Sequence, residues 1–525
     1  MKIKNSCLIY LLVTALAVGS IACNKLLDVP PQGKLTYEEF WNSKDQSVAA
    51  IAGLYSMLGS SRANWNGNQS ATAVSPVECY VYWGEMRGEY LASNPGKLAT
   101  DQVNKENIDN FLVTPNDVLT KFTQFYKIII QANQCIKNIP GVGVKDPAFA
   151  QTEVDQLTGE AYFIRAFCYF WLVRAFNEVP LMLGTAESDV ENFNIPKAST
   201  EEIYSQIIAD LDMAKTTLPD WYSNVLYAKC RASKNTASTV LADVYLWKAA
   251  LSADATKANQ YYDLALVNCN AVINSNKYLM LHGSILSDVW KLSSTSESIF
   301  ETFSDRSMNN QINNIRGWFS NNQYYIATGA FGNLFGTVVP EYRGLSTLIP
   351  KGPNPPAGIA FTVNPSNNVI LKYQNSTDDN KWNFYRLPEV LLMKAEALAH
   401  RWVDDPTKLQ QASDLVNLIR ARAFGATEYA KIDGVTTIDM DNLILDERGR
   451  EFIAEGKRWF ELVRFATRDN FAHKELLTQR IIQSYSGVNQ FLIGARVSTP
   501  ASWYLPINAD ALSANKMLKQ NPYYE

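Results

Sequence analysis

Carboxylates in two loop-like stretches are the residues of this chain that could carry acid/base chemistry. Glu85 and Glu89 lie in an early stretch, and Asp305 and Glu341 lie in a later one. A glycoside hydrolase needs two carboxylates at a defined separation, which the sequence alone does not supply. We therefore keep a hydrolase only as a remote alternative.

Histidine and cysteine do not suggest a metal or redox site. The three histidines are too scattered for a histidine-rich metal centre. Five cysteines follow residue 23, and they show no CxxC or metal-ligand spacing: Cys79, Cys135, Cys168, Cys230 and Cys269. Those within apolar helical patterns are expected to be small buried residues, although one disulfide stays possible in an oxidising compartment. We expect no metal and no cofactor.

Aromatic residues are the most prominent chemical feature of the composition. The 525 residues include 12 Trp, 26 Tyr and 23 Phe, which is more than a core needs and suggests a binding surface. The formal net charge of -4 gives no electrostatic reason to expect a nucleic-acid partner.

The first 22 residues are typical of a bacterial lipoprotein signal peptide. Lys2 and Lys4 form a basic region, and an apolar stretch too short to span a bilayer follows them. Small residues then lead to Cys23, the expected lipidation site. Acyl chains would anchor the mature chain without a transmembrane helix, through a tether over residues 23–36. A plain secreted protein is the alternative.

The remainder, residues 37–525, is predicted to be one mainly helical domain. Capping boxes at Ser43 and Ser199 predict two helix starts. Other helical patterns cover 118–139, 156–176, 238–251, 259–274, 387–401, 407–423 and 441–466. The stretch 156–176 is apolar nearly all round, so this helix should be buried.

Several of these helices come in pairs joined by short polar linkers, about the length of a tetratricopeptide unit. We therefore expect a superhelix of degenerate tetratricopeptide-like pairs, over about 37–280 and 382–470. An irregular bundle is the alternative. From about 283 to 381, Asn, Ser, Gly and Pro crowd together, and this loop-rich insertion carries many aromatics. Long loops inside a compact domain are usually functional.

The stretch 441–466 is predicted to be a single scaffold helix. Gly449 and Gly456 lie seven residues apart, so both should face one neighbour. Three opposite-charge pairs at i,i+3 spacing should support its other faces: Glu447/Arg450, Glu455/Arg458 and Glu461/Arg464.

The chain resembles the SusD/RagB family of Bacteroidetes outer-membrane lipoproteins. Four stretches carry the resemblance in the expected order. They are 23–33 followed by Glu39-Phe40-Trp41, then 159–170 running on to 179–181, then 385–397 with 447–459, and finally Leu505-Pro506-Ile507 with 520–523.

The resemblance implies a lipid-anchored, non-catalytic cell-surface protein of the outer membrane that functions in nutrient uptake. Members bind glycan and cover a SusC-like TonB-dependent outer-membrane barrel, to which they pass their cargo. The implied fold is a tetratricopeptide-like superhelix with ligand loops packed on it.

The same resemblance places the ligand site on the early loop, Trp65 to Lys97, and on the insertion. Flat rings can cover the apolar faces of sugars, while Arg and Asn bond the hydroxyls. The candidate ligand-binding residues are Trp83, Arg87, Trp318, Tyr324 and Tyr325, with Trp65 and Asn322 behind them. An oligopeptide ligand, as in the RagB branch, is the alternative. The identity, linkage and length of a glycan are not readable from the sequence.

Overall fold

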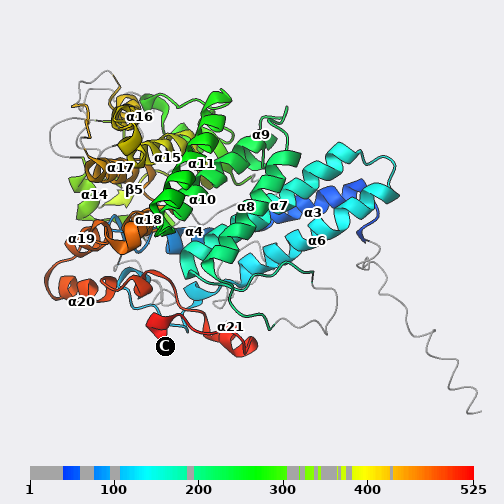
Figure 1. Ribbon diagram of the computed structural model, residues 1–525, viewed down its shortest axis with the longest axis horizontal. Coiled ribbons are helices and arrows are strands. Elements are labelled where there is room, and N and C mark those ends of the chain that lie inside the picture. The colour runs from blue at the N-terminus through cyan, green and yellow to red at the C-terminus, as the bar shows by residue number, and fades with distance from the viewer. Residues whose placement is uncertain are drawn as a thin grey trace, which may run out of the picture.

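The computed structural model describes residues 40–59, 76–94, 107–185, 194–303, 318–319, 325–335, 341–343, 363–364, 368–373, 381–425, 430–434 and 436–525. The predicted signal peptide, Cys23 and the tether lie outside these residues. The described part is mainly helical, which confirms the predicted fold class (Figure 1).

One end of the molecule is built by four long helices. They are α3 (Lys44–Leu58), α6 (Thr123–Lys145), α7 (Gln151–Phe176) and α8 (Thr200–Thr217). Both predicted capping boxes are present, because the hydroxyls of Ser43 and Ser199 accept from the backbone of Gln46 and Glu202. Helix α7 is buried on nearly every face from Gly159 onward, as its apolar pattern predicts.

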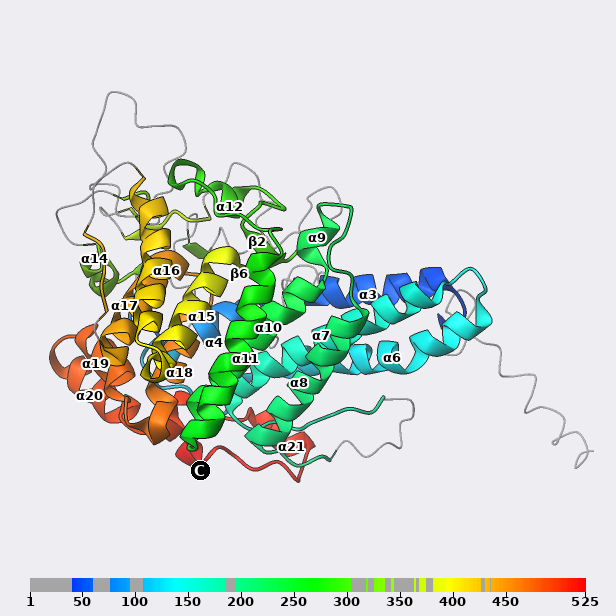
Figure 2. The same cartoon turned by 45° about the horizontal axis from the view of Figure 1, so that its top comes forward.

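Two helix pairs continue the scaffold beyond α8. Helices α10 (Lys234–Leu251) and α11 (Ala255–Asn274) pack together, as do α15 (Leu387–His400) and α16 (Thr407–Phe424). Helix α11 also packs on α15, so the two pairs stack side by side (Figure 2). This arrangement agrees with the predicted tetratricopeptide-like pairing. The short helices α9 (Tyr227–Cys230) and α12 (Asp288–Lys291) follow α8 and α11.

The prediction of one helix over 441–466 is wrong. Helix α17 (Thr437–Phe452) ends before a tight turn, and α18 (Arg458–Phe471) begins after it. Ala454 and Gly456 in this turn have φ of 64° and 72°, which a right-handed helix cannot contain. The two glycines consequently face different neighbours: a Cβ on Gly449 would meet the Tyr90 ring, and one on Gly456 would meet the Tyr80 carbonyl.

The three predicted i,i+3 ion pairs are replaced largely by long-range ones. Glu447 and Arg450 do pair, at 3.0 Å. The other charged groups are buried and pair with distant elements: Glu455 with Lys372 and Arg386, Arg458 with Glu89, and Arg464 with Asp243 and Glu396. These ion pairs therefore connect distant elements in the interior, and they do not line a solvent-exposed helix face.

Small sheets join the insertion to the scaffold and to the early stretch. Strands β2 (Ser298–Glu301) and β6 (Asn383–Arg386) pair antiparallel, which brings the two ends of the insertion together. A second sheet has the order β1-β3-β5-β4, formed by Leu91–Ser93, Tyr325–Ala327, Val369–Ile370 and Val363–Asn364. Figure 2 shows β2 and α12 beyond one end of α10, whereas α14 (Gly329–Asn333) lies beside α16 and α17.

The carboxyl-terminal part packs back onto earlier helices. It contains α19 (Glu475–Gln483), α20 (Gly487–Val497) and α21 (Ala509–Ala514), with 3-10 turns at Pro500–Trp503 and Pro522–Tyr524. The Leu505 amide donates to the Ala175 carbonyl of α7 at 2.8 Å, and Asn508 bonds the Pro115 carbonyl at 3.0 Å.

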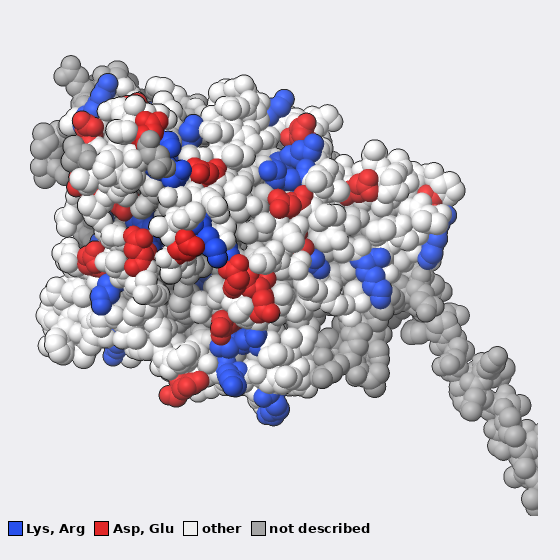
Figure 3. Space-filling model, viewed as in Figure 1, with Lys and Arg blue, Asp and Glu red and all other residues white. Residues whose placement is uncertain are grey.

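The described part contains five buried free cysteines and no group of His, Cys, Asp or Glu suited to hold a metal ion. Burial raises the pKa of Cys135 and Cys230 to about 12, as expected for inert core thiols. None of its helices combines the length and apolarity needed to cross a membrane. On the face drawn in Figure 3, basic and acidic residues are interspersed.

Candidate functional site

Much of the predicted early loop is instead a helix, α4 (Pro76–Gly84), which lies in the core. All nine of its residues are buried, which removes the amphipathic pattern that would reveal a helix in the sequence. The Trp83 indole N–H donates to the Leu119 carbonyl at 2.7 Å, and its ring stacks on Phe125 with 5.0 Å between centroids. Trp83 has no exposed surface and presents no ring face to a sugar.

Arg87 is also an interior residue. Its guanidinium lies over the Trp459 ring, 4.2 Å from the centroid, and Nη1 donates to the Trp503 carbonyl at 2.7 Å. Burial lowers the pKa of Arg87 to about 10. Because Trp83 and Arg87 are both buried, we do not carry them into the proposed ligand contacts.

The insertion residues Trp318 and Tyr325 are both buried, and Tyr325 lies against the early stretch. Trp318 is 5% exposed, and Tyr325 is fully buried. The Tyr325 hydroxyl donates to the Tyr82 hydroxyl at 2.5 Å, which links the insertion to α4. Trp65, Asn322 and Tyr324 lie outside the described residues.

Backbone pairing holds these two stretches together. Strand β1 pairs antiparallel with β3, with Leu91 opposite Ala327 and Ser93 opposite Tyr325. The Thr328 amide donates to the Tyr90 carbonyl at 2.9 Å, just past the end of this pairing. The early stretch and the insertion, both assigned to the ligand site by resemblance, are therefore one structural unit.

A stack of aromatic rings underlies this unit. We call it the aromatic floor, and it consists of Tyr82, Phe319, Tyr325, Tyr373 and Trp382. Phe319 stacks on Tyr373 with 5.5 Å between centroids, and Tyr373 is nearly parallel to Trp382 at 6.2 Å. All five rings are buried. The aromatic floor can support ligand loops, but its rings are too enclosed to be the contact surface.

The described acids proposed for hydrolysis are held in structural contacts. Burial opposes ionisation of Glu89, but the Arg458 guanidinium outweighs it and lowers the pKa of that carboxyl. Glu341 pairs with Arg343 at 3.0 Å. Asp305 lies outside the described residues.

Glu85 lies at the turn between α17 and α18. Its carboxylate accepts from the backbone amides of Ala454 at 2.9 Å and Lys457 at 3.1 Å. Burial nevertheless raises the pKa of Glu85 to about 7. These hydrogen bonds connect the end of α4 to the α17–α18 turn, so Glu85 has a structural role.

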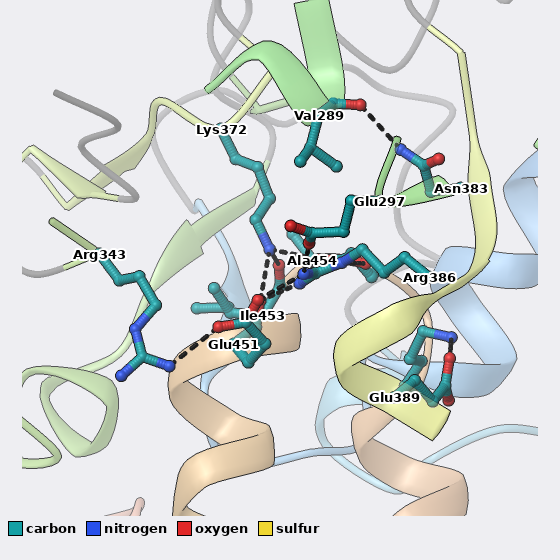
Figure 4. Close-up of polar contacts among 12 residues, drawn as sticks. Val289, Glu297, Arg343, Lys372, Asn383, Arg386, Glu389, Glu451, Ile453 and Ala454 are labelled. Atoms are coloured by element: carbon teal, nitrogen blue, oxygen red, sulfur yellow. Dashed lines mark hydrogen bonds and ion pairs between the residues drawn. The ribbon is translucent and has the colours of Figure 1, made fainter. Parts of the chain in front are cut away.

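A buried ion network anchors the insertion to the scaffold (Figure 4). Arg386 lies 2.6 Å from Glu297 and also pairs with Glu451 and Glu455. From the insertion, Arg343 reaches Glu451 at 2.9 Å. Burial opposes ionisation of Glu451, but three surrounding guanidiniums outweigh it and hold the pKa of its carboxyl well below its usual range.

Lys372, next to β5, closes the network over the α17–α18 turn. Its ammonium donates to the carbonyls of Glu451 at 3.1 Å and Ile453 at 2.9 Å, and to the Glu455 carboxylate at 2.6 Å. A cation at a helix carboxyl end satisfies carbonyls that have no partner within the helix. Figure 4 shows Lys372 and Arg386 meeting at this turn.

Two family models match separate parts of the chain. The model described as the SusD family matches residues 349–524, and the one described as "Starch-binding associating with outer membrane" matches residues 71–246. The chain belongs to the SusD/RagB family. The first match includes the insertion's last third and the α15–α18 scaffold, and the second includes α4 and β1.

The similarity to SusD-like relatives and to solved SusD superfamily structures covers most of the chain. SusD-like protein P38 of Formosa agariphila is 25% identical over 507 residues, covering 88% of this chain and 92% of that protein. SusD-like protein P2 of the same organism is 26% identical, with 85% and 88% covered.

The fold is shared with SusD superfamily structures at lower identity. One from Bacteroides fragilis has a TM-score of 0.71 at 19% identity, covering 92% of this chain and all of that one. Another, from Parabacteroides distasonis, has a TM-score of 0.67 at 22% identity, with 92% and 99% covered.

For this SusD-family chain, sequence reasoning missed the residues that build the base of the candidate site. Tyr82, Tyr373 and Trp382 were indistinguishable from other aromatics, and the ion network joins residues far apart in the sequence. The one available signal was local: Lys372 and Arg386 are charged residues with apolar neighbours in the sequence, which is a pattern that can indicate a buried ion pair.

Proposed function

We propose that this protein captures glycans at the cell surface and delivers them to a SusC-like TonB-dependent outer-membrane barrel, without catalysis. The pairing of β1 with β3 supports this proposal, because it brings together the two stretches that the resemblance assigns to ligand binding. The matched family description names starch binding and association with the outer membrane. Lipidation at Cys23 would supply the anchor.

Ligand contact is assigned to Tyr324, Asn322, Trp65 and Trp318. Tyr324 and Asn322 directly precede β3, and Trp65 precedes α4. Trp318, which is 5% exposed, is the one described residue of this group. A shallow site on loops favours weak binding, in the micromolar to millimolar range, or about -4 to -8 kcal/mol. Weak binding suits a protein that must release its cargo.

The test is affinity electrophoresis of the mature chain in gels containing neutral plant glycans, host-type glycans, fructans or acidic polysaccharides. Tyr324→Ala is compared with Tyr227→Ala, a change at a 45% exposed tyrosine of α9. Retardation by one polymer that Tyr324→Ala abolishes and Tyr227→Ala preserves would support the proposal.

Unchanged migration of the wild-type chain with every polymer would contradict the glycan function and direct the search to oligopeptides. Release of reducing sugar by the purified chain would contradict the non-catalytic role. Delivery to a barrel is tested separately, by whether a SusC-like barrel co-purifies with the tagged lipoprotein from detergent-solubilised outer membranes.

A further inference from the structure

A polar cavity of about 20 Å³ lies in the scaffold, and Trp382 of the aromatic floor is one of its lining residues. Helices α7, α10, α15, α17 and α18 meet around it, together with β6 and the α17–α18 turn. Its charged lining is Arg174, Asp243, Glu389, Arg448, Glu455, Lys457, Glu461 and Arg464. Trp171 and Trp247 line it as well.

The charges of the lining balance one another. Four are cationic and four are anionic, so their formal sum is zero. Most are paired directly: Arg464 lies 2.7 Å from Asp243, and the Tyr385 hydroxyl donates to Asp243 at 2.8 Å. The cavity therefore has no excess charge that requires a counter-ion.

Hydrogen-bond donors are left over around the cavity. The indole N–H groups of Trp171 and Trp247 are buried and have no acceptor among the described residues. The same holds for Nε and Nη1 of Arg448, whose Nη2 alone contacts Glu389 and Glu461. Buried donors without an acceptor are rare, and each one requires an explanation.

We infer that this cavity is a binding site for one ordered water molecule. Its volume suffices for a single water, and a buried water needs two to four polar partners. The water accepts from the indole or guanidinium N–H groups and donates to Glu461, whose Oε1 lies 2.7 Å from Arg448 but outside hydrogen-bonding geometry. An anion would also accept from the donors, but it would add a negative charge beside four carboxylates.

The direct test is a crystal structure of the mature chain at 1.8 Å resolution or better, from crystals grown without halide. A spherical density peak within hydrogen-bonding distance of Arg448 and one indole is the expected result. A cavity without density would overturn the inference. A second crystal soaked in bromide distinguishes the ligands, because an anomalous peak in the cavity would show an anion site instead.

A solution test replaces the Trp247 indole N–H by sulfur, using 3-benzothienylalanine, which keeps the ring shape. Two other positions calibrate the effect. Trp503 donates to the Val497 carbonyl at 2.8 Å, so the replacement there should lower the urea midpoint. Trp290 has a buried N–H without an acceptor and lies outside the cavity lining, so its replacement should not lower the midpoint.

The same replacement is made at Trp171, the other indole of the lining. With a bound water, at least one of Trp171 and Trp247 should behave like Trp503, because the replacement there removes a hydrogen bond. A midpoint that stays the same or rises at both positions, as at Trp290, would overturn the inference.

Discussion

The hydroxyl of Tyr325 donates to the hydroxyl of Tyr82 across 2.5 Å, and both rings are buried. One residue belongs to the insertion and the other to α4, with more than half of the scaffold between them in sequence. This contact and the β1–β3 pairing beside it join the early stretch to the insertion.

We expect the two hydroxyls to be energetically coupled. A double-mutant cycle with Tyr82→Phe and Tyr325→Phe should give a coupling of about 0.5–1.5 kcal/mol in the free energy of unfolding, because either change alone removes the same hydrogen bond. Urea unfolding of the four proteins measures it. Additive effects would show that the contact contributes nothing to stability.

Removal of the Arg386 charge should destabilise the protein strongly. Arg386→Met would leave three buried carboxylates without their shared cation, which typically costs about 3–5 kcal/mol. Lys234→Met is the matched control, because Lys234 pairs with Asp220 at the surface, and this change should cost at most about 1 kcal/mol. Equal losses in denaturant unfolding would contradict the importance assigned to the network.

Two glycine substitutions should change stability in opposite directions. Gly456→Ala places a Cβ 2.5 Å from the Tyr80 carbonyl at a φ of 72°, and we expect a loss of at least about 1–3 kcal/mol. Gly53→Ala, in α3, meets nothing within 4 Å and should gain about 0.5–1 kcal/mol. Thermal unfolding of both variants checks the prediction, which fails if Gly456→Ala is neutral.

The raised pKa of Glu85 predicts a pH dependence of stability. Its carboxyl is protonated more readily in the folded chain, with a pKa of about 7, than at its ordinary value of 4.5. The folded state therefore binds more protons between these values, so this contribution to the free energy of unfolding is full below 4.5 and declines as pH rises to 7.

Glu85→Gln should flatten the stability profile between pH 4.5 and 7. Glu153→Gln is the control, because the Glu153 carboxyl is exposed and its pKa is lowered chiefly by a hydrogen bond from Lys44, so it titrates below this window. Denaturant unfolding at several pH values measures all three slopes. Identical slopes for wild type and Glu85→Gln would show that Glu85 does not titrate there.

Local signals in the sequence predicted local structure well. The Ser43 and Ser199 capping boxes marked two helix starts because each involves groups only three residues apart. The apolar surround of 156–176 predicted a buried helix for a similar reason. Pro388 lies in the first turn of α15, where its missing N–H is harmless.

Features that depend on distant partners could not be predicted. The apolar spacing of α17 runs on into α18, so periodicity alone did not show the break, which needs positive φ at Ala454 and Gly456. Helix α4 has no exposed face and so no amphipathic pattern. The contacts of Trp83 and Arg87 depend on Leu119 and Trp503, whose proximity only the fold creates.

The pairing of Leu91 with Ala327 also constrains the order in which the chain can assemble. Loop closure over so long a segment is entropically unfavourable until the intervening helices have shortened the distance. Helices α6 to α11 should therefore form before β1 and β3 meet. The candidate binding unit is then among the last parts to be completed, so only a chain that has finished folding would be able to take up cargo.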